Sequence, residues 1–268
     1  MNPIDLVFER LQAEKRTALI PFITTGDPDL RTTVDIVVEL EKAGADMIEL
    51  GVPYSDPLAD GPVIQKASER ALRNPITLEA CVDVAAKARE AGVKMPFILF
   101  TYYNPVLQYG LERFFTLLHE QGISGLIIPD LPIEEDGEVR EMAAEAGVHL
   151  VPLVAPTSKA RVQRIAAEAQ GFVYCVSSLG VTGMRSEFHA GLEGFLESVR
   201  EATPLPIAVG FGISSREQVE RMSASADGVI VGSAIVRQVE EALPLLSDET
   251  TYRQGIEQIG RFVAGLRV

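Results

Sequence analysis

Apolar and polar residues follow one another along this chain in a pattern that repeats. A stretch rich in Ala and Glu, with the spacing of an amphipathic helix, closes on a glycine, and a short apolar run follows it. Glycine suits the left-handed position that ends a helix, and short, continuously apolar runs are typical of strands covered on both faces. The repeat occurs in the segments LEKAGADMIELG, AREAGVKMPFILF, LHEQGISGLIIPD, AAEAGVHLVPLVAP and AAEAQGFVYCVSS.

This repeat predicts about eight strands alternating with helices, the organisation of a (β/α)8 TIM barrel. A doubly wound open sheet competes with it, but no G-x-G-x-x-G follows the first strand. No linker divides residues 1–268, so we expect a single TIM-barrel domain, with an extra N-terminal helix over residues 3–14 covering the barrel floor. The apolar runs that we take as strands are TALIPFIT, residues 47–50, 97–100, 126–128, 150–154 and 172–176, LPIAVGFG and ADGVIVGS.

Composition narrows the choice of partners. The net charge of −14 argues against a nucleic-acid backbone or an anionic membrane surface, whereas a small anion can still bind where backbone dipoles make a local positive site. Two distant cysteines and three scattered histidines form no metal-binding pattern, so we expect no metal. The N-terminus lacks the apolar core of a signal peptide and no run is long enough to span a bilayer, so we expect a cytoplasmic protein.

Glycine turns follow the last three predicted strands, in SSLGVTGMRSEF, AVGFGISS and VIVGSAIV. Gly183, Gly210, Gly212 and Gly232 have no side chain, so backbone N–H groups there can approach an anion. The second and third turns lead into helices whose N-termini favour negative charge, and Ser233 adds a hydroxyl donor. Each turn alone is equally typical of an ordinary loop. Three turns at adjacent strand ends favour a phosphate site that needs no Lys or Arg.

Glu49 is the acid that the pattern singles out most clearly. It lies in the apolar run MIEL, where side chains alternate between the two faces of a strand. If Ile48 and Leu50 face the surrounding helices, Glu49 points into the barrel mouth, where partial burial raises a carboxyl pKa and suits it to acid–base chemistry. The alternative is that Glu49 pairs with a cation at the barrel rim.

Asp60 and Asp56 are less clear from spacing. Asp60 precedes Gly61-Pro62 and is as well placed to cap the next helix as to act chemically. Asp56 lies in the turn segment SDP. Apolar and aromatic residues near the strand ends are candidates either for a flat apolar pocket or for barrel core: Phe22, Phe100, Tyr102, Ile127, Tyr174 and Phe211.

At this point the sequence resembles a known family. The segment IELGVPYSDPLADGPVIQ is similar to the signature of tryptophan synthase alpha subunits, and PFITTGDPD, TYYNPV, PDLP, GVTG and GFGIS occur in that family's order. The resemblance implies retro-aldol cleavage of indole-3-glycerol phosphate to indole and glyceraldehyde 3-phosphate. In this chain it implies catalytic roles for Glu49 and Asp60, with Tyr174 near Glu49. It further implies phosphate binding and indole binding by two sets of residues: Gly183, Gly212, Gly232 and Ser233; and Phe22, Phe100, Ile127 and Phe211.

The same resemblance implies a mobile lid after Ser177, in which Thr182 closes toward Asp60. It implies a beta-subunit partner in a heterotetramer of two alpha and two beta subunits, with pyridoxal phosphate (PLP) in the partner and no cofactor in this chain. Residues that match the family's docking face are Pro53, Asp56, Asn104 and the segment 129–132, which includes Pro129 and Pro132. Two alternatives stay open: a barrel isomerase or epimerase acting on a sugar phosphate, and a mainly allosteric subunit with little activity alone.

Overall fold

A computed structural model describes residues 1–176, 191–210 and 212–268. Its strands are all parallel, and each apolar run of the sequence forms one strand except the run over 150–154, which forms two. The strands are β1 (Ala18–Thr24), β2 (Ile48–Gly51), β3 (Phe97–Phe100), β4 (Gly125–Ile127), β5 (His149–Leu150), β6 (Leu153–Val154), β7 (Val173–Val176), β8 (Ile207–Gly210) and β9 (Gly228–Val231).

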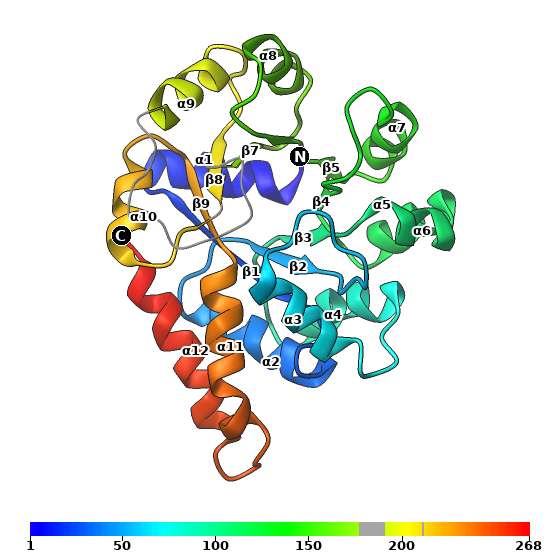
Figure 1. Ribbon diagram of the computed structural model, residues 1–268, viewed down its shortest axis with the longest axis vertical. Helices are drawn as coiled ribbons and strands as arrows, with labels where there is room; N and C mark the ends of the chain where they lie inside the picture. The colour runs from blue at the N-terminus through cyan, green and yellow to red at the C-terminus, as the bar shows by residue number, and fades with distance from the viewer. Residues whose placement is uncertain (177–190, 211) are drawn as a thin grey trace.

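Helices surround this sheet on its outer side (Figure 1). Side-chain oxygens of Asp29, Thr77, Ser158 and Ser215 cap four of them by accepting from backbone N–H groups of the first turn. No helix in the described part of the chain is long and apolar enough to cross a bilayer. The helices are α1 (Pro3–Glu14), α2 (Leu30–Lys42), α3 (Pro62–Ala71), α4 (Leu78–Glu90), α5 (Tyr103–Tyr109), α6 (Leu111–Glu120), α7 (Gly137–Glu145), α8 (Lys159–Ala167), α9 (Leu192–Arg200), α10 (Arg216–Ser223), α11 (Ser233–Leu246) and α12 (Tyr252–Leu266).

The strand order is β5-β4-β3-β2-β1-β9-β8-β7-β6, so the two edge strands, β5 and β6, are consecutive in the sequence. We predicted one strand over 150–154, but Pro152 has no N–H to donate and the run divides into β5 and β6. The Val151 N–H donates to Leu126 O at 2.9 Å, and Pro152 O accepts from the Tyr174 N–H at 3.0 Å. The link therefore joins the two edges, and the sheet curls into the TIM barrel that the repeat predicts.

β1 changes its partner halfway along. Its first four residues, Ala18 to Pro21, pair with β9, and Phe22 to Thr24 pair with β2. The change of partner falls directly after Pro21, and β6 likewise begins directly after Pro152. The ring thus consists of two runs of strands, β1–β5 and β6–β9 with β1, that meet at Pro21 and at Pro152.

Strand residues alternate between two cores. Met47 belongs to the cluster inside the ring, whereas Ile48 and Leu50 pack in the cluster between strands and helices. The helix α1 contributes to the inner cluster, and its Phe8 ring lies 5.6 Å from the ring of Phe172. This confirms that α1 covers the barrel floor. Its residues in the inner cluster are Ile4, Val7, Phe8 and Leu11.

A buried ion pair ties the helix that follows Asp60 to the rest of the barrel. Arg70 on α3 donates to both carboxylate oxygens of Asp27, at 2.9 and 2.8 Å, and to Glu240 on α11 at 2.9 Å. Asp27 is 3% exposed, and burial raises its pKa although Arg70 opposes the shift. The three residues connect the loop after β1 with both helices.

Arg70→Met should lower the free energy of unfolding by about 3 kcal/mol, because it leaves the buried Asp27 carboxyl without its cation. Urea denaturation measures this change. The matched control is Glu240→Gln, which removes only the more exposed ion pair, between Arg70 and Glu240. It should lower the free energy of unfolding by about 1 kcal/mol or less. Equal losses from the two variants would contradict the importance of the Asp27–Arg70 pair.

Candidate active site

The site lies at the carboxyl ends of the strands, where TIM barrels hold their ligands. A pocket there is lined by residues from β1, β2, β3, β7 and β9 and by the loop that leads into α3. It brings together eight of the predicted site residues: Phe22, Glu49, Asp60, Phe100, Tyr174, Gly212, Gly232 and Ser233.

Glu49 occupies the centre of this pocket. It lies between Phe22 of β1 and Ile98 of β3 in the strand register and is 1% exposed. Its Oε1 atom is buried without a hydrogen-bond partner in the described residues, so the predicted alternative of a rim ion pair is not seen there. Burial raises the pKa of Glu49 from 4.5 to about 8. At neutral pH this carboxyl group keeps its proton.

Asp60 has a different environment. Its pKa is raised to about 6, mainly by burial, and a hydrogen bond from the Tyr102 hydroxyl lowers it in part. The same hydroxyl accepts from the Ala59 N–H at 2.9 Å. Gly61 is the N-cap of α3 and no side chain caps that helix, so Asp60 does not serve as the cap. The carboxylate is held beside the pocket and is ionised at neutral pH.

Aromatic side chains form the apolar wall. The rings of Phe22 and Phe100 meet edge to face, with centroids 5.6 Å apart. Tyr174 is 4% exposed, and its pKa is raised by burial and by the charge of Glu49. A Cβ atom on Gly210 would lie 2.4 Å from the Tyr174 hydroxyl oxygen, so that strand end needs a glycine for the ring to fit.

The glycine turns also reach the pocket. Gly212 has φ +77°, a conformation that favours glycine, and Gly232 is the N-cap of the 14-residue helix α11, which Ser233 begins. Free N–H groups at such a helix start attract anions. Gly212 and Ser233 also line an adjoining outer cavity of ≈ 490 Å³.

The remaining site predictions have mixed positions. Ile127 is buried in the inner core, and Tyr102 is held against Asp60 and Ala59 rather than lining the pocket. Thr182, Gly183 and Phe211 lie outside the described residues. No group of three or more His, Cys, Asp or Glu side chains in the described residues is placed to hold a metal ion.

Sequence reasoning missed four residues that line the pocket. Ile230 precedes Gly232 by two positions, so the alternation along β9 could have placed both on the inner face. Gly61 and Ile64 belong to the start of α3, directly after Asp60, and no separate pattern marks them. The four residues are Ala59, Gly61, Ile64 and Ile230.

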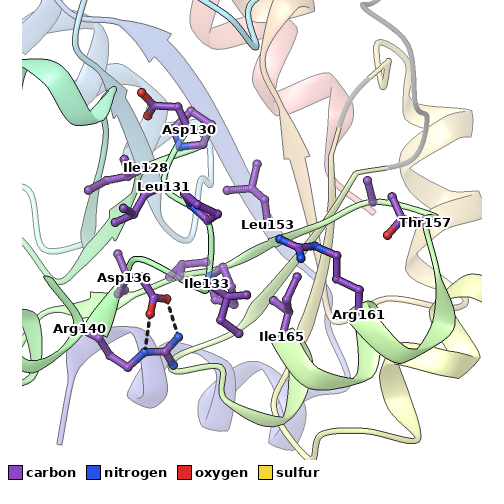
Figure 2. Close-up of a pocket in the computed structure, with 16 residues that line it drawn as sticks. Ile128, Asp130, Leu131, Ile133, Asp136, Arg140, Leu153, Thr157, Arg161 and Ile165 are labelled. Carbon is purple, nitrogen blue, oxygen red and sulfur yellow. Dashed lines mark hydrogen bonds and ion pairs between the residues drawn. The ribbon is translucent and has the colours of Figure 1, made fainter. Parts of the chain in front are cut away.

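A second pocket, of ≈ 410 Å³, opens between α7 and α8 beside the divided strand (Figure 2). Its floor is apolar, and it is bordered by the predicted docking residues Pro129 and Pro132. Arg140 at its edge donates to Asp136 through Nε at 3.3 Å, and Arg161 pairs with Glu134. Both arginines are paired with acids, and the acids Asp130 and Asp136 that line this pocket are only half-buried. We therefore regard the pocket as a binding surface and not as a site for acid–base chemistry.

The ring of parallel strands, with two buried acids facing glycine turns at its carboxyl end, is the arrangement of a TIM-barrel enzyme site. The family model of the tryptophan synthase alpha chain matches residues 8–263. Tryptophan synthase alpha chains from Halalkalibacterium halodurans and Geobacillus kaustophilus are each 51% identical to this chain, over 253 and 247 residues. The first alignment covers 94% of this chain and 95% of the relative, and the second covers 92% of each.

A solved structure agrees. The tryptophan synthase subunit alpha from Legionella pneumophila superimposes with a TM-score of 0.88 at 34% identity, over 100% of this chain and 97% of that one. The chain belongs to the tryptophan synthase alpha chain family, whose members are lyases in general terms. This supports the main prediction over the sugar-phosphate isomerase or epimerase.

Glu49→Gln should make the protein more stable than the wild type as pH rises. Because the pKa of Glu49 is about 8 when folded and 4.5 when unfolded, the unfolded state loses this proton first. The wild type is therefore destabilised progressively between those two values. Gln cannot ionise, so its advantage in unfolding free energy should grow by about 3 kcal/mol between about pH 5 and about pH 8.

Urea denaturation at the two pH values measures this difference. Asp56→Asn, which changes an exposed acid in the following loop, is the matched control and should show no such growth. A pH-independent difference between Glu49→Gln and the wild type would mean that Glu49 is not buried in its protonated form.

Proposed function

We propose that this chain cleaves indole-3-glycerol phosphate to indole and glyceraldehyde 3-phosphate, with no cofactor of its own. The observation that carries the proposal is the pair of buried acids, whose pKa values differ: about 8 for Glu49 and about 6 for Asp60. Near neutral pH one acid holds a proton to give and the other carries a charge, which is what a retro-aldol cleavage of an indole side chain needs.

Glu49 acts as the acid and then the base. Its carboxyl proton goes to C3 of the indole ring, and the ring nitrogen takes up the developing positive charge. The resulting carboxylate then removes the proton of the hydroxyl next to the ring. The bond between C3 and the side chain breaks as that oxygen becomes the aldehyde, and the electron pair returns to the ring. Tyr174, beside Glu49 on the pocket wall, limits the access of water.

Asp60 stabilises the intermediate. Its carboxylate accepts a hydrogen bond from the indole N–H and faces the positive charge that develops on the ring. The Tyr102 hydroxyl fixes the orientation of this carboxylate and favours its ionised form. Phe22 and Phe100 supply a flat apolar wall for the indole ring. The phosphate then lies at the start of α11, on the N–H groups of Gly232 and Ser233.

The test is indole release from indole-3-glycerol phosphate, measured by absorbance or chromatography. Glu49→Gln should reduce the rate by about a hundredfold or more, while the pH-dependent unfolding described above shows that the variant is folded. Asp56→Asn, an exposed acid, should retain the rate of the wild type in the isolated chain. Near-normal indole release by Glu49→Gln would contradict the proposed mechanism.

We propose further that the chain works in the cytoplasm with a tryptophan synthase beta subunit, which holds PLP and receives the indole, in a heterotetramer of two alpha and two beta chains. Of the predicted docking residues, Asp56, Asn104 and Pro132 are exposed, Pro129 is half-buried and Pro53 is buried within this chain. Asn104 donates to the Tyr54 hydroxyl at 3.3 Å, so the loop after β2 and the start of α5 hold each other in place.

Two exposed leucines, Leu58 in the loop after β2 and Leu107 in α5, support docking there. Leu58 is 82% exposed and Leu107 is 49% exposed, in a structure where most large apolar side chains that are described lie in the core. They follow β2 and β3, at the same end of the barrel as the pocket. Large apolar side chains left in water near a functional site commonly mark a protein interface.

Leu58→Asp with Leu107→Asp should weaken the binding of a beta chain by about tenfold or more, because both changes put a charge into the proposed interface. Calorimetry or analytical ultracentrifugation measures the affinity. Leu72→Asp, on another exposed leucine, is the control and should bind normally. Unchanged affinity of the double variant would place the interface elsewhere.

Comparing indole release with and without the beta chain decides the remaining alternative. A mainly allosteric subunit would release almost no indole alone and would gain activity only in the complex. Full activity of the isolated chain would exclude that alternative.

A further inference from the structure

The outer cavity next to the pocket contains a cation that the sequence-based phosphate site did not include. The cavity of ≈ 490 Å³ shares Gly212 and Ser233 with the acid-lined pocket, and Arg237 lines it as well. Among the described residues that line either cavity, Arg237 is the only Lys or Arg. Glycine turns alone were expected to hold the phosphate, so the presence of this side chain needs an explanation.

The position of Arg237 on α11 follows from helix geometry. It lies four residues after Ser233, so both side chains project from the same face of the helix. A rise of about 1.5 Å per residue puts its Cα about 6 Å along the axis from that of Ser233. An arginine side chain bends back toward the helix start and is long enough to bring its guanidinium to an anion held by the first-turn N–H groups.

The Arg237 side chain is also available. It is exposed, and within the described part of the chain it makes no hydrogen bond or ion pair. Two other arginines on exposed helix faces pair with an acid four residues away: Arg216 with Glu220, and Arg253 with Glu257. Arg237 has Glu241 at the same spacing, but that carboxylate accepts from Gln238 at 2.9 Å instead.

The charges around the cavity favour an anion at its Ser233 end. Glu241 is the acid that lines the same cavity, and it lies eight residues beyond Ser233, about 12 Å along the helix axis. Arg237 stands between the two positions. The chain as a whole carries a net charge of −14, so a doubly charged phosphate approaching the mouth meets a repulsive field that a local cation offsets.

We propose that Arg237 contacts the phosphate group of the substrate from the solvent side and is a specificity-determining residue for phosphomonoesters. The inference rests on the proposed function and extends it: Glu49 and Asp60 recognise the indole ring, and Arg237 recognises the phosphate group. The N–H groups of Gly232 and Ser233 hold the inner phosphate oxygens, and the guanidinium donates to the outer ones.

The experiment measures phosphate affinity and catalysis separately. Arg237→Gln should weaken the binding of inorganic phosphate and of glycerol 3-phosphate by about five- to tenfold in calorimetry. It should raise KM for indole-3-glycerol phosphate by a similar factor while kcat stays within about twofold, because the interaction is the same in the ground and transition states. Arg237→Lys should recover part of the affinity, since it keeps the charge and loses the two-point contact.

Arg261→Gln on α12 is the matched control. Arg261 is 70% exposed and has only a 4.0 Å contact with Glu257, so this variant should bind phosphate as the wild type does. Unchanged phosphate affinity and KM in Arg237→Gln, in a wild type that cleaves the substrate, would overturn the inference. If the wild type releases no indole but its phosphate affinity still depends on Arg237, the proposed reaction fails and the anion contact stands.

Discussion

The burial of one carboxyl group, with no counter-ion among the residues that the structure describes, is the constraint on which the rest of this site depends. Glu49 lies on the inner face of β2 and touches the apolar interior of the ring. Nothing in the described residues offers its Oε1 atom a hydrogen bond. A carboxylate in that position is shielded from bulk solvent and meets no cation among the described residues, so the group holds its proton until the solution is alkaline. The alternation of side chains along a short strand is what creates this condition.

The two acids differ because their neighbours differ. Asp60 is buried too, but it follows the strand in a loop, where the hydroxyl of Tyr102 reaches it from the end of β3. The same hydroxyl accepts from the N–H of Ala59, the residue before Asp60, and this hydrogen bond joins residues 43 positions apart in the chain. One site thus contains a neutral acid and an anionic one at the same pH, with no lysine or arginine among the described residues that line the pocket. The start of α11, where we propose that the phosphate binds, lines the same pocket from the opposite run of strands.

Much of the barrel could be predicted because the strands are short apolar runs, five of which (β2, β3, β4, β5 and β7) follow a helix that closes on a glycine. The observed strands lie within about two residues of those runs. The inward direction of Glu49 followed from its apolar neighbours Ile48 and Leu50. The surroundings of Asp60 could not be predicted, because spacing alone does not reveal that a tyrosine hydroxyl from another loop contacts it. The division at Pro152 was readable in principle. The burial of Pro53 depends on tertiary packing, which the local sequence does not contain.

The two places where the ring of strands changes partner have a consequence for how the site can move. Pro21 and Pro152 divide the barrel into half-barrels, one made of the early strands and one made of the late strands. Glu49 and Asp60 belong to the early half, and Tyr174, Gly232 and Ser233 belong to the late half. A substrate that fills the pocket therefore bridges the seam between them. Because β1 pairs with both halves, a rotation of one half against the other would have to break hydrogen bonds of this shared strand, which therefore limits any change in the separation of the acids from the start of α11.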